Sequence, residues 1–222
     1  MSMKQSLFIL GVIQEEGMQI GDKIEFSGYD WRVLDIKDNA ALIITEDIVE
    51  LRAYHNKPGD ITWADCELRK YLNGEFLERF INADKDKIIP TTIVNSNNPW
   101  FGTIGGEDTN DKVFLLSIEE VVCKYFGDSS ENLLRVPNGK YKYWFTKKDN
   151  NNAKRISSYL GYIWWWWLRS PGRKQVKAVY IHGDGNIGIQ GNSALKCNLS
   201  DVIHPVNNDL RGGICPALWL KL

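Results

Sequence analysis

The side chains best suited to metal or nucleophilic chemistry are four cysteines and three histidines, and their spacing matches no metal or catalytic motif. Zinc sites and redox pairs usually contain two cysteines separated by two residues, and this chain has no such pair. No histidine belongs to a nucleophile motif. We therefore expect no zinc site. We expect the cysteines to be free thiols in a reducing compartment. The residues concerned are Cys66, Cys123, Cys197, Cys215, His55, His182 and His204.

The loop "GGEDTND" at 105–111 offers a different chemistry, because its carboxylates could hold calcium. Glu107, Asp108 and Asp111 supply the oxygen ligands that calcium prefers, but not at the spacing of an EF-hand. The same side chains also cap turns. A structural calcium ion that orders the loop and turn capping without a metal are the two interpretations. We favour turn capping and expect no cofactor.

Basic residues concentrate in the segment 135–177. It contains eleven Lys or Arg and one acid, Asp149, so its net charge of +10 leaves −11 for the rest of the chain. Aromatic residues alternate with these charges, a pattern that suits phosphate contacts and base stacking. Single-stranded nucleic acid or another polyanion is therefore one candidate partner. The interpretation that we favour is that this segment folds against the acidic remainder.

The stretch "IWWWWLRSPG" places four tryptophans side by side at 164–167. Side chains alternate along a strand, so Trp164 and Trp166 would share one face, and Trp165 and Trp167 the other. We expect one buried pair and one partly exposed pair, because exposed indoles make good contact surfaces. Burial of all four is the alternative. We expect Arg169 to tie loop carbonyls together at the strand end rather than to contact a ligand.

The elements that would position these residues combine early helices with late antiparallel strands. The helical period of 63–80 predicts a helix that Gly74 weakens in its middle. Ser117 and Glu120 form a capping box that begins a helix ending near Gly127. The chain is therefore predicted to be α+β. Strands are predicted over 24–26, 29–36, 40–45, 91–95, 112–117, 164–170 and 214–222, and a hairpin over 176–190.

Length and composition fit one large domain. The chain has 222 residues and is 43% hydrophobic, which suffices for a proper core; we assign 1–19 to an N-terminal segment and 20–222 to a single domain. No apolar run approaches the roughly 20 residues of a membrane helix. "SLFILGVI" near the N-terminus lacks the cleavage site of a signal peptide. We expect a cytoplasmic protein without a membrane partner; export by another route and association with a virion stay open.

Several short segments of the sequence, taken together, resemble those of a known protein family. They are "YDWRVLDI", "TWADCELRKYLNGEF", "NPWFGTIGGEDTNDKVFLLSIEEV", "WWLRSPG", "AVYIHGDGNI" and "GGICPALWLKL". They resemble a large family of uncharacterised bacterial domains, the domain of unknown function 6273 type, marked by Trp-Leu-Arg-Ser-Pro-Gly and a terminal Arg-Pro-Ala-Leu-Trp-Leu. The resemblance covers about 20–222. The family is in turn similar to the C-type-lectin fold of the formylglycine-generating-enzyme type, which includes many variable proteins of diversity-generating retroelements.

The resemblance implies a non-catalytic protein that presents a variable ligand-binding surface, over about 164–215, on a fixed scaffold. After Gly172 the chain contains Asn together with other residues that can arise when adenines in Asn codons are changed. Ordinary divergence of an exposed hairpin is the alternative. The expected ligand is an unidentified protein or another macromolecule. The expected contact residues are Trp164, Trp166, Arg173, Lys174, Gln175, Lys177, Tyr180, His182, Gln190, Asn192, Ser193 and Lys196.

The cysteines near the C-terminus depart from what the resemblance implies. Cys215 stands where the family usually has Arg, and a cysteine cannot make the hydrogen bonds by which Arg would anchor the terminal strand. Formylglycine-generating enzymes bind copper through two nearby cysteines, whereas Cys197 and Cys215 are eighteen residues apart in unmatched surroundings. We therefore expect no oxidase chemistry and no enzyme activity.

Overall fold

The computed structural model describes residues 17–126, 151–195 and 211–222, and two five-stranded sheets form its framework. The first sheet has the order β1 (Lys23–Phe26), β2 (Tyr29–Lys37), β3 (Ala40–Thr45), β14 (Ala217–Lys221) and β5 (Ile88–Ile89). The second has the order β12 (Ile187–Ser193), β11 (Lys177–Ile181), β10 (Trp166–Pro171), β13 (Gly212–Ile214) and β4 (Glu50–Arg52).

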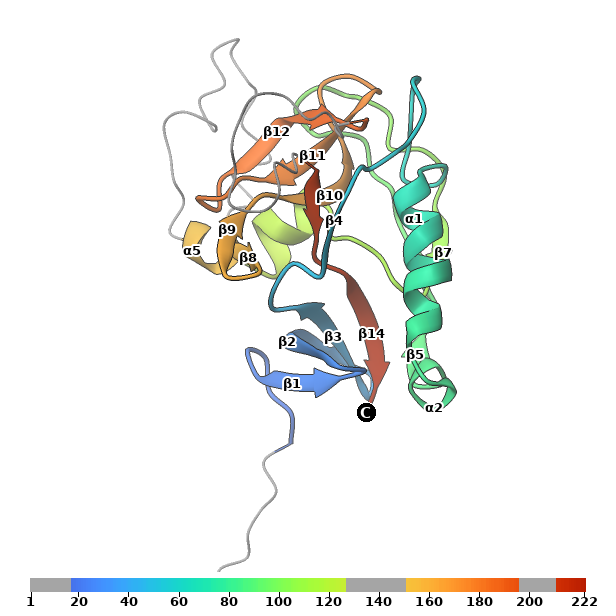
Figure 1. Ribbon diagram of the computed structural model, residues 1–222, viewed down its shortest axis with the longest axis vertical. Helices are drawn as coiled ribbons and strands as arrows, with labels where there is room; N and C mark the ends of the chain where they lie inside the picture. The colour runs from blue at the N-terminus through green and yellow to red at the C-terminus, as the bar shows by residue number, and fades with distance from the viewer. Residues whose placement is uncertain (1–16, 127–150, 196–210) are drawn as a thin grey trace, which may run out of the picture.

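Smaller elements surround the two sheets. Two hairpins pair β6 (Thr91–Ile93) with β7 (Thr109–Asp111), and β8 (Ser157–Tyr159) with β9 (Tyr162–Trp164). The helical segments are α1 (Glu67–Tyr71), the π-helix η1 (Leu72–Phe76), the 3₁₀-helix η2 (Leu77–Arg79), α2 (Asn82–Lys85), the π-helix η3 (Glu120–Lys124) and α5 (Asn152–Arg155). In Figure 1 the first sheet lies below the second, and α1 runs along one side.

The predicted α+β class is confirmed. Most strand pairs are antiparallel, and β10 with β13 is a parallel pair. The three predicted N-terminal strands match β1, β2 and β3, and the turn between β2 and β3 consists of Asp38 and Asn39, both at positive φ. This is the turn chemistry that a tight hairpin requires. The predicted hairpin over 176–190 is confirmed as β11 and β12.

The C-terminal strand is not one strand, as the sequence predicted, but two strands in different sheets. β13 pairs with β4 and β10, and β14 pairs with β3 and β5. Cys215 and Pro216 lie at the crossing. Pro216 has no N–H to donate to a ladder, and its carbonyl accepts a hydrogen bond from the Thr45 N–H at 3.0 Å. The crossing connects the two sheets around one hydrophobic core.

The helix predicted over 63–80 begins later, at Glu67. The Cys66 sulfur accepts a hydrogen bond from the Arg69 N–H at 3.3 Å and caps the helix. The chain then continues through η1 and η2 to Arg79, and Gly74 lies inside the wider π-helical turn. Gly74 therefore accompanies a change of helix type rather than a break.

The predicted capping box is confirmed. The Ser117 N–H donates to the Glu120 carboxylate at 2.7 Å, and the Glu120 N–H donates to the Ser117 hydroxyl at 3.3 Å. The helix begins at Ile118 and becomes π-helical from Glu120 to Lys124. The end predicted near Gly127 lies outside the described residues.

The strand predicted over 112–117 is wrong. Only Phe114 pairs, in an isolated bridge with Ala217 at the start of β14. Farther along β14, the same edge is taken by β5. The next carbonyls are used elsewhere, because the Arg169 N–H donates to the Leu116 carbonyl at 3.0 Å.

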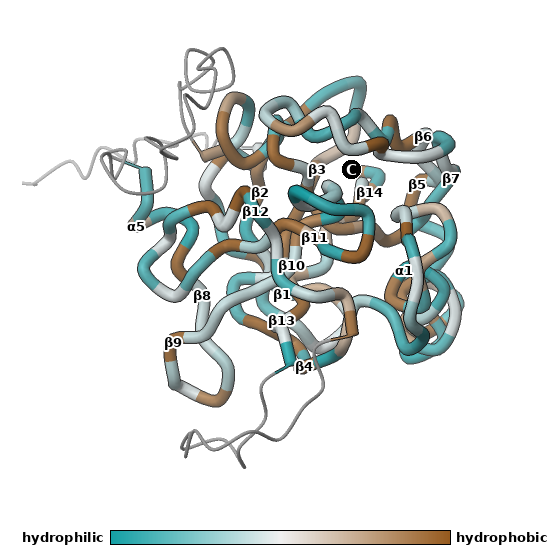
Figure 2. The backbone as a smooth tube through the Cα atoms, turned by 90° about the horizontal axis from the view of Figure 1, so that it is seen from above, coloured by the Kyte–Doolittle hydropathy of each residue, from teal (hydrophilic) through white to brown (hydrophobic). Residues whose placement is uncertain are grey.

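Hydrophobic residues concentrate in the strands toward the centre of the molecule, and hydrophilic residues are frequent in the outer loops (Figure 2). The core includes Trp31, Trp63, Trp166 and Trp167, each at most 2% exposed. No helix in the described ranges combines the length and the apolar character that crossing a membrane requires.

Candidate binding face

A row of aromatic rings crosses the face of the second sheet. The Trp165 ring lies 5.2 Å from the Tyr180 ring and 4.6 Å from the buried Trp167 ring, in edge-to-face geometry. The Tyr180 ring lies 6.5 Å from the His182 imidazole. Trp165 and Tyr180 are partly exposed, and His182 is exposed. The row therefore presents aromatic contact area to a ligand, with rings that hold each other in place.

Glycines form the floor beneath these rings. A Cβ at Gly188 would lie 2.3 Å from the Tyr180 ring, and a Cβ at Gly212 would lie 2.6 Å from the Trp165 ring. Either side chain would force a ring to move. Tyr180 and Gly188 are direct partners in the β11–β12 ladder, so the ring lies across its neighbouring strand.

A pocket of about 210 Å³ opens beside Tyr180. Lys177 and Tyr180 of β11 line it together with Gly188, Gln190 and Gly191 of β12. Burial, and then the charge of Asp184, raise the pKa of Tyr180 above its ordinary value. Its hydroxyl therefore stays protonated at neutral pH. The pocket can offer an ammonium, a phenol and an amide to one ligand.

Partly exposed and buried positions both occur along β11 and β12, without strict alternation. Lys177, Tyr180 and Gln190, all expected contacts, are partly exposed. The positions between them form the core; they are Ala178, Val179, Ile181, Ile187 and Ile189. Variation at Lys177 and Gln190 would leave the core residues unchanged, because neither belongs to the core, whereas Tyr180 packs against it.

The other expected contacts lie around this pocket with different exposures. Arg173 and Lys174 are exposed in the turn between β10 and β11. Asn192 is partly exposed and Ser193 is exposed at the end of β12. Lys196 lies outside the described residues.

Gln175 has a different environment from its neighbours in the turn. Its amide donates to the Ile61 carbonyl at 3.1 Å and to the Ile104 carbonyl at 2.8 Å. It therefore ties two loops to the turn rather than facing outward.

The expected faces of the tryptophan run need correction. Trp166 is 2% exposed, and its indole donates to the Arg155 carbonyl, so it is a core residue and not a contact. Trp167 is also fully buried, and the partly exposed pair is Trp164 and Trp165. The reason is a break at Trp165, between β9 and β10. The sequence alone gives no signal for this break, so Trp165 was not predicted as a contact residue.

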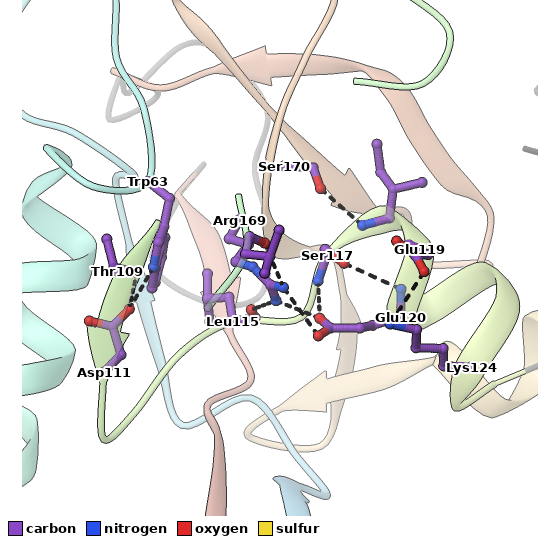
Figure 3. Close-up of polar contacts among 12 residues, drawn as sticks. Trp63, Thr109, Asp111, Leu115, Ser117, Glu119, Glu120, Lys124, Arg169 and Ser170 are labelled. Atoms are coloured by element: carbon purple, nitrogen blue, oxygen red, sulfur yellow. Dashed lines mark hydrogen bonds and ion pairs between the residues drawn. The ribbon is translucent and has the colours of Figure 1, made fainter. Parts of the chain in front are cut away.

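Arg169 ties loops together, as expected (Figure 3). Its guanidinium donates to the Leu115 carbonyl at 2.7 Å and forms a bidentate ion pair with Glu120. Burial raises the pKa of Glu120, but the Arg169 charge and the hydrogen bonds from Arg169 and Ser117 outweigh it, so the pKa lies below its ordinary value. We call Ser117, Glu120 and Arg169 the cap junction. It joins the helix start to β10.

The three acidic residues of the candidate calcium loop do not converge. The Asp111 carboxylate is buried and accepts hydrogen bonds from Trp63 at 2.9 Å and Thr109 at 2.7 Å (Figure 3). It also pairs with Arg69 at 2.7 Å. The Asp108 carboxylate accepts from the Asn95 N–H at 3.0 Å and so ties together the two sides of the loop between β6 and β7. Glu107 is exposed. Within the described ranges, no three His, Cys, Asp or Glu side chains gather in a metal-binding group.

The described cysteines are poor nucleophiles. Burial raises the pKa of Cys66 and that of Cys215 to about 12, so both stay protonated. Cys215 lies 3.5 Å from the Ser157 hydroxyl at the crossing between the sheets. The terminal strand is held there by its ladder to β3 and by this packing, without a guanidinium.

The comparison with protein families gives one match. The domain of unknown function DUF6273 matches residues 38–222, most of the chain. The chain belongs to the DUF6273 family. No curated protein and no solved structure is significantly similar to it. The DUF6273 match includes both sheets from β3 onward and therefore the whole candidate binding face.

Proposed function

We propose that this DUF6273 protein is a non-catalytic binding protein whose ligand contacts the candidate binding face, formed by Trp165, Lys177, Tyr180, His182 and Gln190. The observation that carries the proposal is the pocket in which Lys177, Tyr180 and Gln190 converge beside the Trp165 ring. Partly exposed aromatics on a glycine floor give contact area at low entropic cost. The high pKa values of Cys66 and Cys215 argue against thiolate catalysis. The ligand is a protein or another macromolecule.

We further propose that the scaffold is of the C-type-lectin type and that retroelement diversification varies this face. The support is the difference in burial along β11 and β12, where the candidate variable residues are at least partly exposed and the residues between them form the core. The test is to sequence the DNA that flanks the gene. A near-copy of the segment encoding about 164–222, differing mainly at adenines and beside a reverse-transcriptase gene, is expected. Without it, the face is not diversified and serves one fixed partner or none.

The binding function itself is tested with a defined probe, a phage-displayed library of random peptides selected on the purified protein. We expect enriched peptides that bind the wild type and lose at least about tenfold in affinity with Tyr180→Ala, as an aromatic anchor should. Trp219→Phe, in the first sheet, is the matched control and should bind them unchanged. The proposal fails if no peptide is enriched, or if the Tyr180 variant binds equally well.

Binding of a polyanion through 135–177 is the second candidate, and the structure weakens its support. Arg155 and Arg169, two of the eleven cations, are buried and bind carbonyls of the fold. The segment 127–150 lies outside the described residues. A gel shift with a single-stranded oligonucleotide that weakens steeply with added salt would favour this candidate over the first.

A further inference from the structure

A second hollow lies away from the candidate binding face, beside β14 of the first sheet. Two adjoining pockets, of about 330 and about 430 Å³, share the lining residues Thr91, Thr92 and Trp219. The first extends to Arg169 and Tyr125, and the second extends to the turn between β2 and β3. We call this the Trp219 groove. It brings together two words that the sequence singles out, "LRSPG" through Arg169 and "PALWL" through Trp219.

All the charged side chains that line the Trp219 groove pair with one another. At the floor, Arg169 and Glu120 form the bidentate pair of the cap junction. At the rim, Lys124 lies 3.2 Å from Glu119. At the far end, the exposed pair of Lys37 and Asp38 is 3.9 Å apart. Among the described residues the groove therefore offers no uncompensated charge. An ionic ligand would have to displace an existing pair or lose its own hydration without a partner.

Several neutral polar groups of the groove are in the opposite situation, although the Thr91 and Ser117 hydroxyls are hydrogen-bonded within the fold. In the described part of the chain, the Tyr125 hydroxyl, the Trp219 indole N–H and the Thr92 and Ser96 hydroxyls make no hydrogen bond. Burial raises the pKa of Tyr125 well above its ordinary value, so its hydroxyl remains a donor. Trp219 is partly exposed in the middle of the groove. The groove thus combines a flat apolar indole with hydrogen-bonding groups that carry no charge.

We propose that the Trp219 groove binds a small uncharged hydroxylated ligand of the chemical class of a mono- or disaccharide. A sugar ring has an apolar C–H face, which can lie on the Trp219 indole, and hydroxyls at its rim, which can bond to Tyr125 and Thr92. The hollow has the volume of a typical small-molecule site. A nucleoside would also stack on the indole but carries fewer hydroxyls, so its binding is compared with that of the sugars in the test.

The test uses the full chain labelled with ¹⁵N. The indole N–H signal of Trp219 is assigned by its loss in Trp219→Phe, which distinguishes it from the other eight tryptophans. The probes are neutral mono- and disaccharides of glucose, galactose, mannose and their N-acetyl derivatives. The comparison ligands, called counterparts below, are the charged sugars glucuronate and glucosamine, and the nucleoside adenosine. We expect at least one neutral sugar to shift the Trp219 signal saturably, and the charged counterparts and adenosine to bind at least tenfold more weakly. The proposal is overturned if no neutral sugar shifts the signal, or if a counterpart binds as tightly.

Variants locate the site. Thr92→Val and Tyr125→Phe should each lower the affinity for the sugar about fivefold, the effect of one hydrogen bond, while the remaining indole signals stay in place. Tyr180→Ala, on the candidate binding face, is the matched control and should leave sugar affinity unchanged. Thr92 is exposed, so its replacement reports on binding without threatening the fold. Unchanged affinity in both groove variants would place any sugar binding elsewhere and overturn the proposal.

Discussion

The cap junction and the candidate binding face are both built on β10 and the segments beside it, and they use polar residues in opposite ways. In the cap junction, Arg169 is buried and only 14% of the Glu120 side chain is exposed; the two charges pair with each other, and Arg169 also donates to loop carbonyls. On the binding face, Lys177 and Gln190 stay partly exposed around the Tyr180 ring. The difference teaches that residue type does not separate scaffold from contact surface. Burial and the presence of internal partners do.

The largest effect is expected from breaking the cap junction. Arg169→Met leaves the Glu120 carboxylate buried without its partner, which should lower the free energy of unfolding by about 3–5 kcal/mol. Urea denaturation measures this loss. The double variant Arg169→Met with Glu120→Met should recover much of it, because no charge then stays buried. A single variant as stable as the wild type would show that the pair contributes nothing.

The same pair should make the protein sensitive to acid. The folded-state pKa of Glu120 is below its ordinary value of 4.5, so its contribution to stability is complete above that value and is lost as the pH falls through the folded-state pKa. Glu50 and Asp184 also have lowered pKa values, so the comparison must be with Glu120→Gln. The stability difference between wild type and this variant should shrink between about pH 5 and pH 3. A constant difference would mean that Glu120 is not the titrating group.

A smaller loss of stability is expected on the binding face, where the Tyr180 ring lies close over Gly188. Gly188→Ala places a methyl group 2.3 Å from the Tyr180 ring, and such overpacking costs about 1–3 kcal/mol. Adding Tyr180→Ala removes the clash, so the double variant should be more stable than Gly188→Ala alone. Thermal denaturation of the two single variants and the double variant tests this. Simple additivity would show that the ring does not lie over Gly188.

The smallest effect on stability is expected for the cations of the face. The triple variant Arg173→Ala, Lys174→Ala and Lys177→Ala should change the free energy of unfolding by less than about 0.5 kcal/mol per site, as exposed substitutions do. The same variant should lose binding to peptides selected on the wild type. If it unfolds instead, the face belongs to the scaffold, and its contrast with the cap junction disappears.

Local signals in the sequence predicted much of the fold. The strands up to Thr45 and the β11–β12 hairpin follow from alternation and turn residues, and the capping box follows from Ser117 and Glu120 at their spacing. These features depend on residues a few positions apart. The sequence also assigned Arg169 to the scaffold, because a guanidinium at a strand end has carbonyls within reach.

The missed features depend on partners far along the chain. Trp166 would face a ligand if the tryptophan strand were continuous, but the break at Trp165 buries it and brings Trp165 to the face. Residues 112–117 have the composition of a strand and yet pair only at Phe114, because β5 takes the adjoining edge of β14. Nothing local identifies which neighbour takes an edge.

The sequence by itself thus determined the α+β class, the N-terminal turns and the cap, because short-range periodicity and backbone preferences fix them. Tertiary structure alone decided which tryptophans are core, where the C-terminal chain changes sheets, and that Arg169 and Trp219 line one groove. Those outcomes follow from competition between distant segments for the same ladder edges and the same buried volume.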